Sequence, residues 1–429
     1  MTEEPNLRPA ATRPWWIPRF LGRAPDLEEQ HYRLLGFVSL ALFFENYDFS
    51  LLTAALPFIA DSLGIGEAEL GGFTGLIRLG SLPAFLVLPF ADRLGRRRIF
   101  LLSVVALSVG TLLTGLCQTA TQFVAVQMFT RTFMMTAATV AFVMVSEELP
   151  AAHRGWGIGM LGALASLGHG LSAALFAVVE LLPFGWRALY LVGFLPVFFL
   201  GSFRRGVPET QRFASQQHSE DKVVLAGYLE PMRLLVSRYP ARAVGIAVLG
   251  VLTWGAMGAS YQFTAQFLLI HRGWDPAQYS MLVLTAGGLG FAGNILAGRL
   301  GDVFGRRMVG VLFVGIFPLL SYGFFQNEGA VMVVSWSLLV LSLTATSTIG
   351  RAFATELFPT TYRGTSAGLQ SVMETIGAAG GLALATIGMR AGLELTTVLP
   401  LISLFAIGAA LVILTFPETR GRELEAISE

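Results

Sequence analysis

Five ionisable side chains stand well inside long apolar stretches of this chain, where charge is otherwise rare. Glu45 and Asp48 lie three residues apart, so a helix would place both carboxylates on one face. Arg78, Arg131 and Glu374 lie in three further stretches. A carboxylate can hold a proton or a cation, and a guanidinium can bind an anionic group. These five residues are therefore the candidates for handling a charged solute.

The composition explains why such charges need a reason. Hydrophobic residues make up 54% of the 429 residues and charged residues only 13%, against roughly 25% charged residues in soluble proteins. So few polar side chains could not cover the surface of a water-soluble protein of this length. In a bilayer, an ionisable group near the midplane costs at least about 2.5–3.5 kcal/mol, so it needs a partner or a function.

Several classes of function are excluded by what the sequence lacks. The net charge of +1 gives no basic surface for a nucleic acid. Cys117 is the only cysteine and the histidines have no metal-ligand spacing, so we expect no metal and no cofactor. The sequence contains no nucleotide-binding loop or nucleophile elbow, so we do not expect an enzyme.

The elements that position the five charges are membrane-spanning helices. About 20 mostly apolar residues cross a bilayer as a helix. Twelve stretches qualify: 35–60, 71–90, 99–117, 122–147, 157–181, 188–203, 243–270, 279–298, 308–325, 330–354, 366–388 and 395–415. Arginine is concentrated before the first stretch and in the loops after the second, sixth and eighth. We therefore expect an all-α, multi-pass membrane protein of a bacterial inner membrane, with both termini in the cytoplasm.

Three short segments recur at nearly one offset, about 210 residues. Asp-Arg-Leu-Gly-Arg-Arg at 92–97 returns as Asp-Val-Phe-Gly-Arg-Arg at 302–307, Glu-Leu-Pro at 148–150 as Glu-Leu-Phe-Pro at 356–359, and Pro-Glu-Thr at 208–210 as the same triplet at 417–419. This repeat predicts two pseudo-symmetric six-helix bundles, at 35–203 and 243–415. A cytoplasmic tail at 1–34, a cytoplasmic linker at 204–242 and a cytoplasmic tail at 416–429 complete the chain. Parallel halves of this kind are a transporter architecture.

These motifs resemble those of the major facilitator superfamily over nearly the whole chain. The resemblance rests on the two Asp-x-x-Gly-Arg-Arg loops, the Glu…Pro…Arg-Gly ends of the fourth and tenth stretches, and the Pro-Glu-Thr segments, which recur in the sugar-porter and organic-ion branches. Glu45-Asn46-Tyr47-Asp48 is similar to the Asp-Gly-x-Asp signature of proton-coupled aromatic-acid symporters, with Glu for the first Asp and Asn for Gly. Glu374 lies close to where organic-cation carriers place an acidic residue.

In that superfamily, charge pairs on the cytoplasmic side lock one conformation. The resemblance implies this gating role for Asp92, Arg93, Gly95, Arg96, Arg97, Glu148 and Arg154 in the first half, and for Asp302, Gly305, Arg306, Glu356 and Arg363 in the second. The first loop departs from the family pattern, because Leu88 stands where the second copy has Gly298, so we expect a looser helix contact there. A plainer alternative is that these arginines only set the topology.

The resemblance also implies that the first, fourth, seventh and tenth stretches line one central cavity, where Glu45, Asp48 and Arg131 would meet. We hypothesise that, without solute, Arg131 pairs with Asp48 and keeps it ionised. An anion that takes Arg131 leaves Asp48 buried and unpaired, so Asp48 binds a proton and both cross together. Glu45 is the second candidate for proton coupling. In the alternative, Arg131 and Asp48 form a structural ion pair with no coupling role.

Four residues of the seventh stretch complete the expected solute site. Gln262 and Gln266 lie four residues apart on one helical face and can form hydrogen bonds with a polar solute. Trp254 and Tyr261 can contact the solute as well, or can serve in packing.

Three functions remain open. The first is secondary active transport of a small organic solute, an anion bound by Arg131, through alternating access with proton symport. Arg78 then either faces the cavity or pairs with Glu374. The second is proton-driven efflux of drugs or organic cations, held by carboxylates such as Glu374. The third is a non-transporting membrane sensor, which would normally carry an additional soluble domain. We expect a monomer whose partners are the solute, protons and the lipid bilayer, and no nucleic acid.

Overall fold

The computed structural model describes residues 14, 16–17, 24–150, 153–207 and 225–420, apart from the side chains of residues 89, 92, 225–229 and 360. In chain order its helices are α1 (Glu29–Ala54), α2 (Leu56–Leu63), η2 (Glu67–Glu69), α3 (Leu70–Leu79), α4 (Ala84–Leu94), α5 (Arg96–Leu116), α6 (Ala120–Glu148), α7 (Arg154–Phe176), η3 (Val179–Leu181), α8 (Trp186–Val192), η4 (Leu195–Phe199), α9 (Leu200–Gly206), α11 (Leu225–Arg238), α12 (Pro240–Gln262), α13 (Thr264–Gln266), η5 (Phe267–His271), α14 (Pro276–Phe304), α15 (Arg306–Gln326), α16 (Gly329–Glu356), η6 (Thr360–Tyr362), α17 (Arg363–Arg390), α18 (Leu395–Ser403) and α19 (Phe405–Thr415). The predicted tails and linker lie partly outside the described residues.

All twelve predicted membrane spans are confirmed. Within the described ranges, twelve helical spans are long and apolar enough to cross a bilayer, and each overlaps one predicted stretch. The first span begins earlier than predicted, at Glu29, and α1 ends at Ala54 because Pro57 has no N–H to continue the helical hydrogen bonds. The second span is interrupted between α3 and α4, just before and at Pro83, for the same reason.

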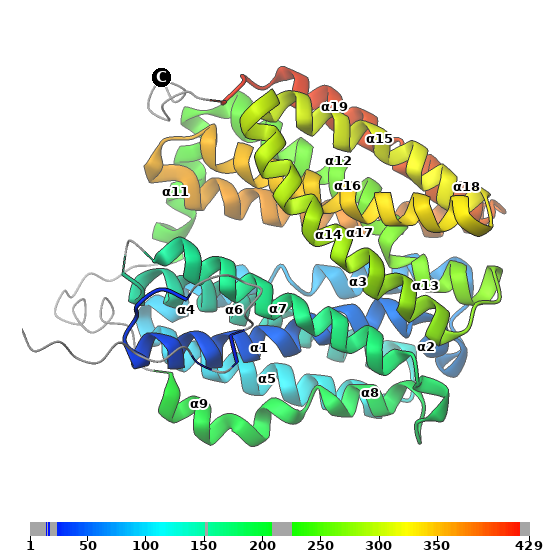
Figure 1. Cartoon of the computed structure of the whole chain (residues 1–429), viewed down its shortest axis with the longest axis horizontal. Helices are drawn as coiled ribbons and strands as arrows, with labels where there is room; N and C mark the ends of the chain where they lie inside the picture. Colours follow the sequence, from blue (N-terminus) through cyan, green and yellow to red (C-terminus); the bar gives the residue numbers. More distant parts are fainter. Residues whose placement is uncertain (1–13, 15, 18–23, 151–152, 208–224, 421–429) are drawn as a thin grey trace, which may run out of the picture.

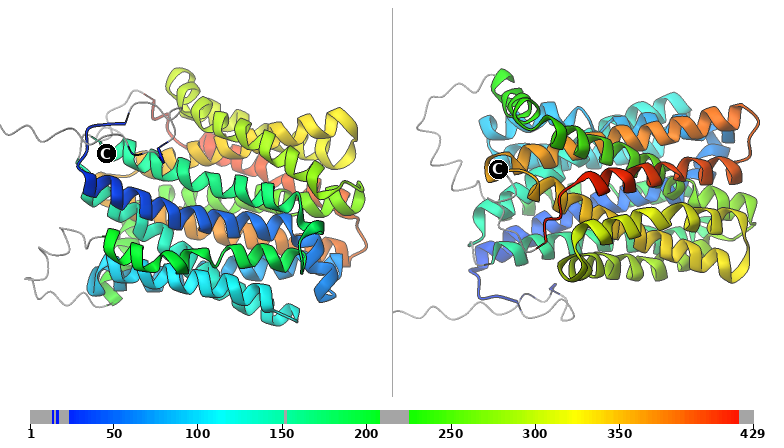
Figure 2. Two further views of the ribbon diagram at one scale, coloured as in Figure 1. Left: turned by 60° about the horizontal axis from the view of Figure 1, so that its bottom comes forward. Right: turned by 90° about the horizontal axis from the view of Figure 1, so that it is seen from above.

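The spans form two bundles that lie side by side. Figure 1 shows α1 to α9 in the first bundle and α12 to α19 in the second, with the helices running along the long axis of the molecule. The first residue of α1 and the last residue of α19 lie at the same end, which Figure 2 shows from two further sides. We call this the terminal end and the opposite one, at α2 and α13, the far end.

The apolar core is divided at the terminal end and continuous at the far end. Near the terminal end, one cluster holds residues of the first bundle such as Phe203, and another holds residues of the second such as Phe353. Near the far end, a third cluster takes residues from both bundles, and the rings of Phe176 and Tyr279 meet across the boundary with centroids 5.5 Å apart. The far end is therefore the closed end.

Close backbone contact between α3 and α17 reinforces this closure. A Cβ atom at Gly71 would come 2.2 Å from the carbonyl oxygen of Leu382, so only glycine fits at this contact. The N–H of Gly72 donates to Oγ1 of Thr386 over 2.6 Å. The helices α7 and α14 make a further contact between the bundles.

Candidate functional site

A cavity of about 220 Å³ lies between the two bundles. It is walled by α1, α3 and α6 of the first bundle and by α12 and α17 of the second. The residues predicted to handle a solute that line it are Glu45, Arg78, Arg131, Trp254 and Glu374. The structure thus brings together side chains from five distant segments of the chain in one space.

The two arginines of this cavity share one aromatic ring. The Cζ atom of Arg131 lies 4.5 Å from the centroid of the Phe49 ring, and that of Arg78 lies 5.6 Å from it. Such cation–π contact stabilises a guanidinium without neutralising it. Within the described part of the chain, neither arginine forms an ion pair, and each has a buried Nε atom without a hydrogen-bond partner. Both therefore retain donors for an anionic group.

Asp48 lies behind the cavity wall rather than in it. Its side chain is fully buried, and neither carboxylate oxygen has a hydrogen-bond partner among the described residues. Thr111, Gln127 and Arg131 are its polar neighbours. The expected direct ion pair with Arg131 is not formed, because Arg131 packs on Phe49, while Asp48 lies toward α5 and α6. Glu45 instead lines the cavity, with a buried Oε2 that also lacks a partner.

Glu374 is the charged residue that the second bundle contributes to the cavity. Nε2 of Gln370 donates to its Oε1 over 2.9 Å, and Trp254 lies beside it. Of the two alternatives for Arg78, the structure contains the cavity-facing one, because Nη2 of Arg78 donates to Oε1 of Gln262 over 3.3 Å and no ion pair with Glu374 forms.

The predicted glutamine pair is divided between two places. Gln262 is 2% exposed and does not line the cavity. Its hydrogen bond instead positions Arg78. Tyr261 is near Arg78 but is likewise not part of the cavity wall. Gln266 does not reach the cavity at all. It lies about one turn further toward the far end, because α12 ends at Gln262 and the short α13 carries the chain onward.

Gln266 belongs to a group of contacts that we call the far-end latch: Glu67, Glu69, Gln266, His271 and Arg390. Oε1 of Glu67 accepts from Nε2 of Gln266 over 3.0 Å and lies 2.7 Å from Nε2 of His271. Glu69 pairs with Arg390 over 3.1 Å. Both acids come from η2 of the first bundle and all three partners from the second. Apart from Gln266, these residues were not predicted from the sequence, although two acids in a loop without arginine were a visible signal.

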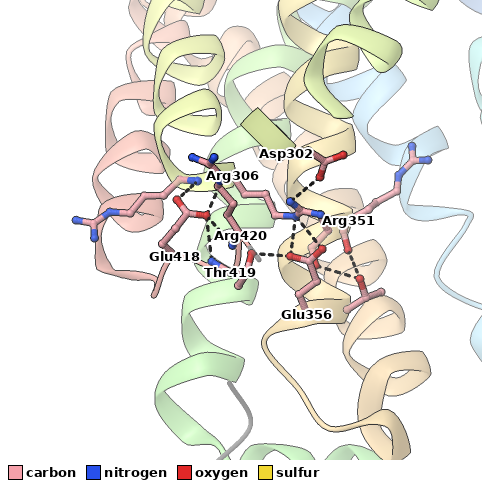
Figure 3. A network of polar contacts seen from close by, with 10 residues as sticks. Asp302, Arg306, Arg351, Glu356, Glu418, Thr419 and Arg420 are labelled. Carbon is pink, nitrogen blue, oxygen red and sulfur yellow. Dashed lines mark hydrogen bonds and ion pairs between the residues drawn. The ribbon is translucent and has the colours of Figure 1, made fainter. Parts of the chain in front are cut away.

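At the terminal end of the second bundle, Arg306 is the centre of a polar network (Figure 3). Its Nε lies 2.8 Å from Oε2 of Glu356, and its Nη1 lies 3.0 Å from Oδ1 of Asp302. Oγ1 of Thr419 donates to Glu356 over 2.5 Å. The predicted trio of Asp302, Arg306 and Glu356 is thus brought together, with Thr419 of the Pro-Glu-Thr segment added.

Glu418 closes the same network at the start of α15. Its carboxylate accepts from the backbone N–H groups of Arg306 over 2.9 Å and Arg307 over 3.1 Å, as an anion at a helix N-terminus does. Partial burial raises the pKa of Glu418, but the backbone donors, including those of Arg420 and Thr419, outweigh it and bring the pKa below its ordinary value of 4.5. Gly305 permits this approach with a φ of +98°. The motif containing Glu418 was recognised, but its role as an acceptor was not.

The first bundle has the corresponding pair with a different acid. Arg96 lies 2.8 Å from Glu147, which was not among the predicted gating residues, whereas its neighbour Glu148 was. The internal repeat carried this signal, because Glu147 stands at nearly the offset from Glu356 that separates Arg96 from Arg306.

The other predicted gating residues of the terminal end take part in fewer of the described polar contacts. Arg97 donates to the backbone carbonyl of Arg204. Arg93, Arg154 and Arg363 form no ion pair with a described residue, and the side chain of Asp92 lies outside the described part of the chain.

The contacts between the bundles lie in the middle of the molecule or at the far end. Where both partners are described, the hydrogen bonds and ion pairs that join the bundles are those of Arg78 with Gln262, Ser81 with Thr375, Gly72 with Thr386, and the far-end latch. The ion pairs of Arg96 with Glu147 and of Arg306 with Glu356 each join two helices of one bundle. Among the described residues, the polar contacts between the bundles therefore lie in the middle of the molecule and at the far end.

Comparison with known proteins gives the family context. Residues 38–382 match the sequence profile of the Major Facilitator Superfamily. The niacin transporter NiaP of Acinetobacter baylyi is 25% identical, over 92% of this chain and 96% of its own. The gallate transporter of Pseudomonas putida is 24% identical, over 98% and 99%, and the cis,cis-muconate transport protein of Acinetobacter baylyi is 26% identical, over 83% and 86%.

Solved structures agree with the fold. The inward open conformation of the xylose transporter XylE from E. coli has a TM-score of 0.72 at 16% identity, covering 92% of this chain and 99% of that one. A D-xylose-proton symporter structure has a TM-score of 0.74 at 15% identity, covering 91% and 99%. The expected all-α membrane fold of twelve helices in two bundles is thereby confirmed.

Proposed function

The chain belongs to the Major Facilitator Superfamily, and from this membership we propose that it carries a small organic acid across the membrane together with protons, by alternating access. As a member of this superfamily it is an integral, multi-pass membrane transporter and not an enzyme. The proposed solute class draws support from the relatives, whose names give niacin, gallate and cis,cis-muconate as what they carry.

One observation carries the anionic solute. Arg78 and Arg131 face the same cavity, and neither has a carboxylate partner within ion-pair distance among the described residues. A buried guanidinium without a counterion is costly, so a carboxylate entering the cavity gains two charge-assisted donors. Gln262 holds Arg78 in place for this contact.

Proton coupling follows from the two acids beside Arg131. Asp48 is buried and Glu45 is partly buried, and three of their four carboxylate oxygens lack a hydrogen-bond partner among the described residues. When a solute carboxylate binds Arg131, the positive charge of Arg131 no longer stabilises the ionised form of Asp48. A proton from water then binds to one of the Asp48 oxygens. One anion and one proton then cross together. Glu45, which lines the cavity itself, is the second acceptor.

Alternating access gives the two ends their roles. The positive-inside rule places the terminal end in the cytoplasm and the far end outside. The far-end latch and the continuous core close the outer side, so this conformation corresponds to one that opens inward. The networks around Arg96 and Arg306 stiffen the terminal end of each bundle, which moves as a unit.

Efflux of cations is the weaker alternative. It would use Glu374 and Glu45 as acidic contacts, but Arg78 and Arg131 line the same cavity and would repel a simple cation.

The test uses purified protein in liposomes. We expect nicotinate or gallate to bind and to exchange in counterflow, and tetraethylammonium to do neither. Arg131→Gln should weaken anion binding by at least about tenfold, while Arg390→Gln, which removes an exposed arginine of the latch, should leave the affinity nearly unchanged. Uptake of the cation, or anion binding that is indifferent to Arg131→Gln, would overturn the proposal.

A further inference from the structure

The two walls of the cavity carry different charges. The wall of the first bundle holds Arg78, Arg131 and Glu45, from α3, α6 and α1, whereas the only charged residue that the described part of the second bundle adds is Glu374. Arg351, the cation that acts on Glu374 from its own bundle, forms no ion pair with it. An anion site and an acidic acceptor thus stand in one space, contributed by opposite bundles.

Glu374 is also held ready as a hydrogen-bond acceptor. Gln370 donates to its Oε1 over 2.9 Å, which orients the carboxylate at the cavity that the residue lines. Trp254, Ser371 and Thr375 complete this wall. A solute group that meets this carboxylate must supply a donor, because a second anionic group there would face a like charge in a site of low dielectric.

The size of the cavity limits what can span both walls. A cavity of about 150 Å³ accepts benzene, and this one has about 220 Å³. It therefore suits one ring, or a chain of similar volume, with a short substituent at each end.

We propose that Glu374 is a specificity-determining residue that selects dipolar solutes, with a carboxylate at the Arg78 and Arg131 wall and a hydroxyl or ammonium donor at the Glu374 wall. The same residue rejects dicarboxylates. This inference rests on the proposed function, because it assumes that the two arginines bind a carboxylate. It separates this chain from a carrier of dicarboxylates such as muconate, with which it shares about a quarter of its sequence.

The experiment compares four probes that differ at the ends of one ring: benzoate, 4-(aminomethyl)benzoate, terephthalate and benzylamine. Binding to the purified full-length protein is measured by calorimetry. We expect 4-(aminomethyl)benzoate to bind about 10- to 100-fold more tightly than benzoate, the range for a hydrogen bond to a charged group. Terephthalate should bind more weakly than benzoate, and benzylamine more weakly than either.

A single substitution tests the residue itself. Glu374→Gln keeps the size of the side chain but removes the charge, so the preference for the ammonium probe should fall at least tenfold and terephthalate should gain affinity. The matched control is Glu394→Gln, which removes an exposed carboxylate at the far end and should leave the order of the four probes unchanged.

The outcomes separate the two proposals. Equal affinity of the wild-type protein for benzoate, 4-(aminomethyl)benzoate and terephthalate would overturn the role of Glu374 while leaving an anion carrier intact, and this ranking does not depend on whether the variant folds. Tight binding of benzylamine without binding of any carboxylate would overturn the proposed function itself.

Discussion

Arg96 lies 2.8 Å from Glu147, and this pair in the first bundle repeats the one between Arg306 and Glu356 in the second. In each bundle the arginine starts a span directly after a glycine with positive φ, and the acid lies at the end of the following span. The pairs therefore tie neighbouring helices of one bundle together at the terminal end, so each bundle can move there as a unit.

The ion pair in the first bundle should contribute more to the stability of the folded protein than the pair in the second. The side chains of Arg96 and Glu147 are only 9% and 8% exposed, and removing one partner of a buried ion pair costs about 3–5 kcal/mol. We expect Glu147→Gln to lower the melting temperature in detergent clearly, measured by intrinsic fluorescence. Glu180→Gln, which removes an exposed carboxylate of the first bundle, is the control and should lower it less. Equal losses would contradict the assignment of Glu147.

Gly305 should not tolerate a side chain. It has a φ of +98°, and an added Cβ would lie 2.6 Å from Oε2 of Glu418. An alanine there would be strained by about 1–3 kcal/mol and would displace Glu418 from the start of α15. We expect Gly305→Ala to lower thermal stability and Gly298→Ala, whose Cβ meets nothing within 4 Å, to be neutral. A Gly305→Ala protein as stable as the wild type would disprove the fit.

The far-end latch should control access from the outer side. Removing Glu67 deletes two contacts between the bundles, so Glu67→Ala should increase the population that is open at the far end. A Ser371→Cys reporter in the cavity wall would measure this as faster labelling by a membrane-impermeant thiol reagent added on that side, with buried Cys117 as the background.

Glu69 provides the matched control for the latch. Its pair with Arg390 is 60% and 62% exposed, and exposed pairs contribute little. Glu69→Ala should therefore accelerate labelling less than Glu67→Ala. If neither substitution changes the labelling rate, the contacts do not hold the far end closed.

Coupling and binding should separate at Asp48. Because Asp48 lies behind the cavity wall, Asp48→Asn should preserve counterflow of a bound anion. It should abolish the alkalinisation of the medium that anion uptake produces through proton uptake. Both are measured on the same liposomes, the second with a pH-sensitive dye. Persistent alkalinisation would show that Asp48 does not carry the proton. Glu45 would then be the proton acceptor, and Asp48 would have a structural role.

The stability of the second bundle should depend on pH through Glu418. Its pKa is lowered below 4.5 in the folded protein, so its contribution is full above the unfolded pKa and is lost as pH falls through the folded one. The melting temperature of the wild type should thus exceed that of Glu418→Gln at pH 6, and the difference should shrink below about pH 4. A constant difference across this range would exclude the carboxylate as its source.

Much of the fold could be predicted because a membrane span depends on the summed hydrophobicity of neighbouring residues. A helix crosses the bilayer when about 20 neighbouring residues are apolar enough, and an ionisable group within such a stretch stands out whatever its partners are. The sequence itself therefore determined the twelve spans and the two bundles. It also marked four ionisable residues within the spans as candidates for a function: Glu45, Arg78, Arg131 and Glu374.

The partners of these side chains were decided only by tertiary structure. One residue along a helix is a rotation of about 100°, so the position of Glu147 opposite Arg96 depends on how α6 is turned against α5. Gln266 lies outside the expected cavity because α12 ends at Gln262, before it. Its side chain instead contacts Glu67 of the other bundle. Whether Arg131 and Glu374 share one cavity depends on how two separately folded bundles pack, and no local pattern of residues carries that information.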